Sequence, residues 1–152
     1  MRHCRHAALA LSLALAFAAG PARAQVVIEI SGANFKPFPL AVAPPLSDGA
    51  AREDALHLDE ALLFDLTSCG LFRVLDRKGF LADPKEGMTS VQFNRWADVG
   101  ADALVKVQVA KEGGQLKAEL RLYTVVTAKE ELKQADARDP REVRRIAHAF
   151  AD

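Results

Sequence analysis

The chain has 152 residues, half of them hydrophobic, with 20 basic and 20 acidic side chains. This length suits a single domain with a modest core. The charges balance and the lysines and arginines are not clustered, so the sequence lacks the basic surface by which nucleic-acid-binding proteins are recognised. That class of function is excluded.

Residues 1–24 have the three parts of a secretory signal peptide. A basic start contains Arg2 and Arg5, an apolar run of about 13 residues follows, and residues 22–24 ("ARA") form a cleavage site of the A-x-A type. The apolar run is too short to span a bilayer, where about 20 residues are needed. We therefore expect export and a mature chain that begins at Gln25.

Cleavage would remove three arginines and no acidic residue, which leaves 17 basic and 20 acidic side chains and a net charge near −3. Cys4 would be removed with the signal peptide, so the mature domain would contain only Cys69 and no internal disulfide. Because Cys69 falls at the end of a predicted helix, we expect it to be a small apolar packing residue.

The mature chain opens with a β-prone run, "VVIEIS" (26–31). Glycine, asparagine and proline residues follow it, and these residue types interrupt regular structure. We expect residues 25–38 to be a free N-terminal strand with a hinge, and residues 39–152 to form the folded domain.

The first elements of the domain are predicted to form a β-α-β unit. A strand over residues 40–43 is followed by a helix over residues 55–69, where apolar residues recur at helical spacing. Gly70 ends the helix, because glycine tolerates the left-handed conformation, and a strand follows at residues 72–75. The helix also carries a second apolar stripe, formed by Leu56, Leu63 and Phe64. This stripe predicts that the helix is covered on more than one side.

A short helix is predicted over residues 91–99, with Ser90 as its cap and Gly100 at its end. The strongest strand signal follows it, as apolar and polar residues alternate on both sides of Gly113-Gly114. This pattern predicts a hairpin with one dry and one wet face. The dry face consists of Val105, Val107, Val109, Leu116, Ala118, Leu120 and Leu122. The wet face includes Lys106 and Gln108.

Residues 130–138 form a weaker predicted strand, and Pro140 starts a last helix whose apolar residues recur at i, i+3, i+4 and i+7. The order β-β-α-β-α-β-β-β-α predicts an α/β fold of the α+β-like kind. In it, about three helices pack mainly on one face of a mixed β-sheet.

The sequence shows no catalytic constellation. His57 and Glu60 lie one helical turn apart, but two ligands do not make a metal site, so a solvated helix face is expected. His148 is expected at the surface, and so are the charged loops "DR" (76–77) and "DPKE" (83–86). No nucleophile elbow, HExxH, CxxC or phosphate-binding glycine loop is present. We therefore expect no enzyme, cofactor or metal; a small hydrolase using His57 or His148 is the enzyme alternative.

Two strings in the middle of the chain carry a family resemblance. "FDLTSCGLFRVLDRKGF" (64–80), followed by "WADVGADALVKVQV" (96–109), resembles the N-terminal domain of the periplasmic Tol–Pal translocation proteins of the TolB family. The "VVIEIS" start and the proline-flanked "FPLAVAPP" (38–45) are also similar, so the resemblance covers residues 25–152. The matching residues are Asp65, Leu66, Gly70, Phe72, Leu75, Asp76, Arg77, Trp96, Gly100, Ala101, Asp102, Val105 and Val109.

The resemblance implies a periplasmic interaction domain of the Tol–Pal system, which supports envelope integrity and cell division. In that family the free N-terminal strand docks onto TolA, and a C-terminal six-bladed propeller binds Pal. The 152 residues contain no propeller, so Pal binding is not expected from them. Carried over to this chain, the partner-binding residues are Val26, Val27, Ile28, Glu29 and Ile30.

Two alternatives remain open at this point. The N-terminal strand could pair with an edge of the domain's own sheet rather than with a partner. The same β/α scaffold also occurs in CsgG-like envelope proteins and in LpoB-like activators of cell-wall synthases. Those proteins are usually lipidated at a cysteine beside the cleavage point, whereas Cys4 precedes the apolar run.

Overall fold

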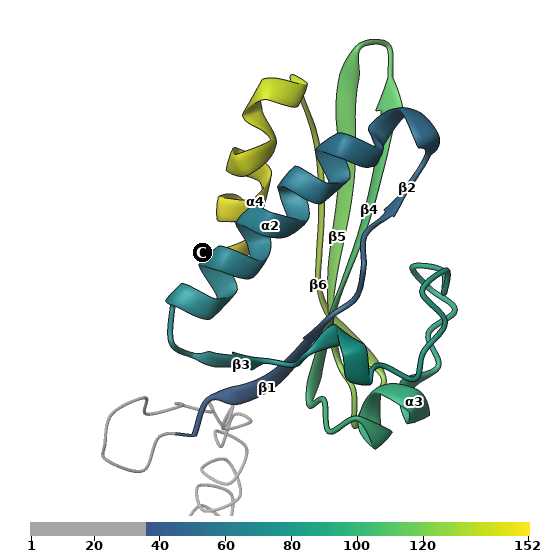
Figure 1. Cartoon of the computed structure of the whole chain (residues 1–152), viewed down its shortest axis with the longest axis vertical. Helices are drawn as coiled ribbons and strands as arrows, with labels where there is room; N and C mark the ends of the chain where they lie inside the picture. The colour runs from purple at the N-terminus through teal and green to yellow at the C-terminus, as the bar shows by residue number, and fades with distance from the viewer. Residues whose placement is uncertain (1–35) are drawn as a thin grey trace, which may run out of the picture. The chain divides into compact units, whose positions relative to one another are not determined.

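A computed structural model of the chain describes residues 36–152, which form one mixed sheet with helices on both faces (Figure 1). The predicted signal peptide and residues 25–35 of the predicted strand and hinge lie outside this part. The strands are β1 (Phe38–Val42), β2 (Leu46–Ser47), β3 (Phe72–Val74), β4 (Ala103–Glu112), β5 (Gln115–Thr124) and β6 (Lys129–Arg138). The α-helices are α2 (Arg52–Ser68), α3 (Phe93–Asp98) and α4 (Val143–Ala151).

The strands follow the order β3-β1-β4-β5-β6, and β2 pairs with β4 beyond the end of β1. β1 runs parallel to both β3 and β4, while β4, β5 and β6 form an antiparallel meander. The predicted mixed sheet and the β-α-β unit are therefore confirmed. The two-residue β2 was not predicted, because it is too short for alternation and follows two prolines that indicate a loop.

Helices α2 and α4 cover one face of the sheet (Figure 1). Val105, Val107 and Val109 are each about 1 % exposed and pack toward these helices, as the alternation predicts. The main core also includes Leu40, Val42, Leu58, Leu62, Leu66, Leu116, Leu120, Val143, Ile146, Ala147 and Phe150. The last helix thus buries the i, i+3, i+4, i+7 stripe that the sequence shows.

The remaining helix, α3, and the loop before it cover one end of the opposite face. A second core forms there around Trp96, Leu104 and Tyr123. Trp96 meets the ring of Phe80 edge to face, with 5.0 Å between the ring centroids. "Mainly on one face" therefore holds for α2 and α4, and α3 is the exception. Helix α3 begins at Phe93 with no side-chain cap, so the predicted Ser90 cap is wrong.

Glycines set two of the turns. Gly70 has φ = +71° where α2 ends, which confirms the predicted left-handed helix terminus. Gly113 and Gly114, with φ of +59° and +82°, make the two-residue turn between β4 and β5. A turn with φ > 0 at both residues matches the twist of the flanking strands, which is why the hairpin keeps a regular register.

Two predictions about α2 are wrong. Leu56 and Phe64 are 52 % and 70 % exposed, so within residues 36–152 only one side of this helix is covered, with Leu63 packed at the margin. Cys69 is exposed rather than packed, because it caps the helix on the solvent side. Its thiol contacts the Leu66 carbonyl oxygen at 3.2 Å.

Candidate protein-interaction site

The five predicted partner-binding residues, Val26–Ile30, lie outside the described residues. The structure does describe where their segment joins the domain. Lys36 and Pro37 are exposed, and β1 begins at Phe38. Since β1 is paired on both sides, by β3 and by β4, it offers no free edge to the preceding segment. Among the described strands, own-edge pairing would have to use β2, β3 or β6.

The loop between β3 and α3 is held down by a buried ion pair. Lys106 Nζ lies 2.7 Å from Glu86 Oε2, and each side chain is only 3 % exposed. Trp96 Nε1 donates to the same carboxylate oxygen at 3.1 Å, and the backbone N–H of Gln92 donates to the other at 2.6 Å. The Glu86 carbonyl oxygen accepts a second bond from Lys106. Asp83, Pro84 and Lys85 are exposed, as predicted for "DPKE", whereas Glu86 is buried. The predictions that Glu86 is solvated and that Lys106 lies on a wet face are wrong, because the loop folds over this end of the sheet.

The electrostatics of this pair favour the charged form of Glu86. Burial raises the pKa of the carboxyl, but the hydrogen bonds from Lys106, the Gln92 amide and Trp96 outweigh burial and leave the pKa below its usual value. Nearby, the Tyr123 hydroxyl donates to the Met88 carbonyl oxygen at 2.6 Å. The loop is therefore fixed at two points by buried polar contacts.

Arg77 occupies the corner where β3 turns away from the sheet. Its guanidinium binds both carboxylate oxygens of Asp59 on α2, at 2.6 Å each. It also donates to the carbonyl oxygens of Val42 at 2.8 Å and Ala43 at 3.3 Å, at the end of β1. The "DR" pair was predicted to be a solvated loop. Instead Arg77 joins α2, β1 and β3, and only Asp76 is exposed.

Arg77→Met is expected to lower the free energy of unfolding by about 2–3 kcal/mol, because the Asp59 side chain, only 7 % exposed, would lose both of its hydrogen bonds from the guanidinium. Urea denaturation of the mature domain measures this. Lys78→Met is the matched control, since its side chain is exposed, and it should change stability by less than about 0.5 kcal/mol. Equal effects of the two substitutions would contradict the stabilising role of the contacts that Arg77 makes with Asp59, Val42 and Ala43.

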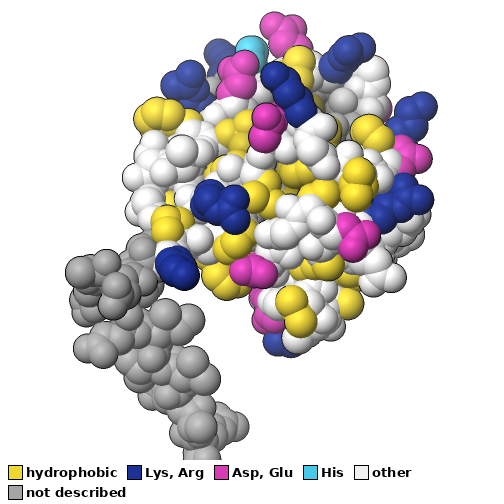
Figure 2. Space-filling view, turned by 60° about the horizontal axis from the view of Figure 1, so that its bottom comes forward, with side chains coloured by type: hydrophobic (Ala, Val, Ile, Leu, Met, Phe, Trp, Pro, Cys, Tyr) yellow, Lys and Arg dark blue, Asp and Glu magenta, His cyan; other side chains and the backbone are white. Residues whose placement is uncertain are grey.

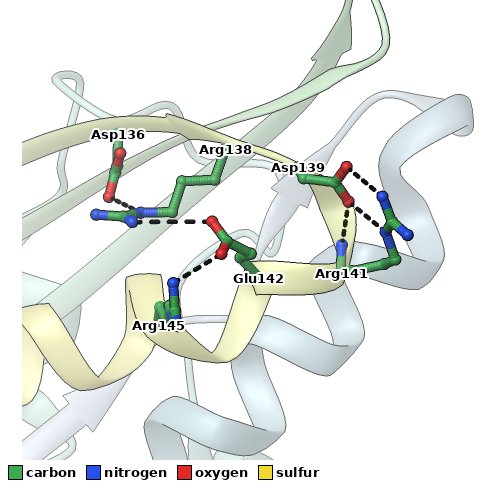
Figure 3. Close-up of polar contacts among 6 residues, drawn as sticks. All are labelled: Asp136, Arg138, Asp139, Arg141, Glu142 and Arg145. Atoms are coloured by element: carbon green, nitrogen blue, oxygen red, sulfur yellow. Dashed lines mark hydrogen bonds and ion pairs between the residues drawn. The ribbon is translucent and has the colours of Figure 1, made fainter.

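The connection from β6 to α4 is set by surface ion pairs (Figure 3). Asp139 accepts from the Arg141 amide at 2.9 Å and from its guanidinium at 3.0 Å, and these bonds lower the pKa of Asp139 to about 2. Glu142 binds Arg145 at 2.7 Å and lies 4.0 Å from Arg138. A capped turn with Pro140 at its first position therefore starts the last helix, as the sequence predicts.

The two histidines of the described part lie at the surface of α2 and α4. His57 is exposed, as predicted. His148 is also exposed, and its Nδ1 lies 2.6 Å from Asp65 Oδ2, so it joins α4 to α2. Both line an open groove of about 610 Å³ between these helices, together with Phe64 and Arg144. Within residues 36–152, no three histidine, cysteine or acidic side chains are grouped to hold a metal.

Comparison with known proteins assigns the family. The model of the TolB amino-terminal domain matches residues 26–131, which is more than half of the chain. The chain belongs to the TolB amino-terminal domain family. That match begins at Val26, the start of the predicted N-terminal strand, and confirms the resemblance shown by residues 64–80 and 96–109.

The relatives of this TolB-family chain are longer than it is. The Tol-Pal system protein TolB of Myxococcus xanthus (strain DK1622) is 49 % identical over 148 residues, which are 95 % of this chain and 34 % of that protein. The protein of the same name in Anaeromyxobacter dehalogenans (strain 2CP-C) is 45 % identical over 150 residues, with the same coverage. The chain thus spans about a third of the length of these relatives.

Solved structures agree on the fold. TolB from Acinetobacter baumannii superposes with a TM-score of 0.64 and 19 % identity, over 77 % of this chain and 27 % of that one. The LpoB C-terminal domain from Escherichia coli gives a TM-score of 0.54 and 16 % identity, over 70 % and 86 %. At these identities the likeness concerns the fold alone.

In the part of the chain that the structure describes, no helix is long and apolar enough to cross a membrane.

Proposed function

We propose that this TolB-family chain is a periplasmic, non-enzymatic docking domain of the Tol–Pal system, and that it binds TolA through its N-terminal strand, Val26–Ile30. Family membership is the observation that carries the proposal, since the relatives are Tol-Pal system proteins and the family match begins at Val26. The domain would present the strand, and the partner's sheet would receive it.

The physical chemistry of the segment supports strand addition. In an extended strand, Val26, Ile28 and Ile30 lie on one face and Val27 and Glu29 on the other. Main-chain hydrogen bonds to an exposed sheet edge supply affinity, and the alternating apolar side chains supply fit. Five residues bury much less than the area of a standard protein interface, so we expect binding in the micromolar range.

The way the segment joins the domain also supports this role. It is attached to β1, both of whose edges are occupied, through residues 31–37. Seven extended residues reach at most about 24 Å. The strand can therefore be offered to a partner without opening the sheet of the domain.

The proposal predicts that Ile28→Pro abolishes binding of the mature chain to the C-terminal domain of the same organism's TolA. Proline removes a ladder hydrogen bond and fixes φ, so a short added strand cannot tolerate it. Calorimetric titration measures binding, and deletion of residues 25–31 should give the same loss. The melting temperature should stay within about 1 °C of the wild-type value, because no described core contact is removed.

Ala33→Pro serves as the matched control, because it places the same substitution in the hinge, and it should leave the dissociation constant nearly unchanged. Binding that survives deletion of residues 25–31 would rule the strand out. Binding lost together with a lower melting temperature would instead support pairing of the strand with an edge of the domain's own sheet.

A further inference from the structure

The end of the domain where the N-terminal segment joins carries exposed apolar side chains on two paired segments. Phe38 and Leu71 are 46 % and 37 % exposed, and the Phe38 amide donates to the Leu71 carbonyl oxygen at 2.9 Å. In the parallel pairing of β1 with β3, Phe38 lies opposite Phe72, which is half-buried. We call Phe38, Leu71 and Phe72 the root patch.

The root patch lies beside main chain that is open to pairing. β3 is the last strand of the described sheet on this side, so its outer edge has no partner among the described strands. Figure 1 shows β1 and β3 starting side by side at the lower end of the domain. Figure 2 turns that end toward the viewer, where hydrophobic side chains are exposed at several places between charged ones. Scattered single apolar residues are normal on surfaces, whereas Phe38 and Leu71 are joined through their main chains where β1 and β3 begin.

The charge beside the root patch is positive. Lys36 precedes Phe38 by two residues, and Arg73 follows Phe72 and lies opposite Pro39; both side chains are exposed. Among the described residues, neither forms a salt bridge, although most other charged side chains of the sheet and of α4 do. A surface of this kind fits a partner that offers an apolar contact bordered by carboxylates.

The length of the hinge makes a second contact effective. A domain that holds Val26–Ile30 is tethered to Phe38 by seven residues, and so lies within about 24 Å of the root patch. A tether this short gives an effective concentration in the millimolar range, at which even a weak second contact adds to the overall affinity.

We propose that the root patch, with Lys36 and Arg73, is a second docking surface for the same domain that receives the N-terminal strand. The inference rests on the proposed function. The strand supplies main-chain hydrogen bonds, and the root patch supplies apolar contact and attraction to acidic side chains on that domain, beside the edge that takes up the strand.

The test compares a synthetic peptide of residues 25–36 with the mature chain, each titrated into the C-terminal domain of the same organism's TolA. The peptide contains the strand and Lys36 but no residue of the root patch. We expect the mature chain to bind about tenfold more tightly than the peptide. Phe38→Ser and Leu71→Ser should each weaken the mature chain toward the affinity of the peptide. Arg73→Glu should weaken it several-fold, and more strongly at low ionic strength.

Leu56→Ser is the matched control, since Leu56 is 52 % exposed near the other end of α2, and it should leave affinity unchanged. Melting curves show whether Phe38→Ser alters the fold, and Arg73→Glu tests the surface without removing an apolar side chain. Equal affinity of peptide and mature chain, with no effect of the root-patch variants, would overturn this inference and leave the strand proposal standing. Failure of both peptide and mature chain to bind would overturn the proposed function itself.

Discussion

Lys106→Met is expected to lower the free energy of unfolding by about 3 kcal/mol at pH 7. The substitution leaves Glu86 ionised and only 3 % exposed, without its principal partner, and removing one member of a buried ion pair costs about 3–5 kcal/mol. We expect a value at the lower end because Trp96 and the Gln92 amide still donate to the carboxylate. Urea denaturation of the mature domain measures the loss.

The loss should depend on pH in a defined direction. In the wild-type domain the pKa of Glu86 lies below its usual 4.5, so its contribution is fully present above pH 4.5 and is lost as the pH falls through the folded-state value. In the variant, burial without Lys106 raises that pKa, and the folded state binds a proton more readily. The difference between wild type and variant should therefore be largest at pH 7 and shrink as the pH falls through and below 4.5.

Lys117→Met is the matched control for Lys106→Met. Lys117 also pairs with a glutamate, Glu112, but the two side chains are 52 % and 62 % exposed. A solvent-exposed ion pair contributes little, so this variant should lose less than about 1 kcal/mol and show little pH dependence. Similar losses for the two lysines would contradict the buried role of Lys106.

Val107→Asp is expected to have the larger effect, a loss of at least about 5 kcal/mol, which is close to the total stability of many domains. Val107 is 1 % exposed and faces α2 and α4, so the substitution buries a carboxylate with no partner in the main core. The variant should be largely unfolded at 25 °C by circular dichroism. Gln108→Asp, on the exposed opposite face of β4, should fold normally. A folded Val107→Asp variant would show that β4 is assigned to the wrong face.

Much of the sheet could be predicted because its signals are local. The alternation of apolar and polar residues predicted which side chains of β4 and β5 face the helices. The glycines predicted the end of α2 and the hairpin turn. The weaker strand predicted over residues 130–138 is also present, as β6, although its residues are mostly polar.

The polar contacts were missed because they join residues far apart in the chain. Glu86 and Lys106 are separated by 20 positions and Arg77 and Asp59 by 18, so no local pattern distinguishes them from solvated charges. One signal was present: Lys106 interrupts an otherwise apolar run, "ALVKV" (103–107). A lysine inside such a run requires a buried carboxylate partner, and the sequence does not say which acid supplies it.

The N-terminal strand remains a prediction from sequence and family. The measurement that tests it most directly is a two-dimensional amide spectrum of the ¹⁵N-labelled mature chain, recorded while unlabelled TolA C-terminal domain of the same organism is added. We expect the largest changes in shift or intensity at residues 26–30, with smaller changes at Phe38, Leu71 and Arg73. Changes confined to the α2–α4 groove around Phe64 and His148, with residues 26–30 unaffected, would contradict it.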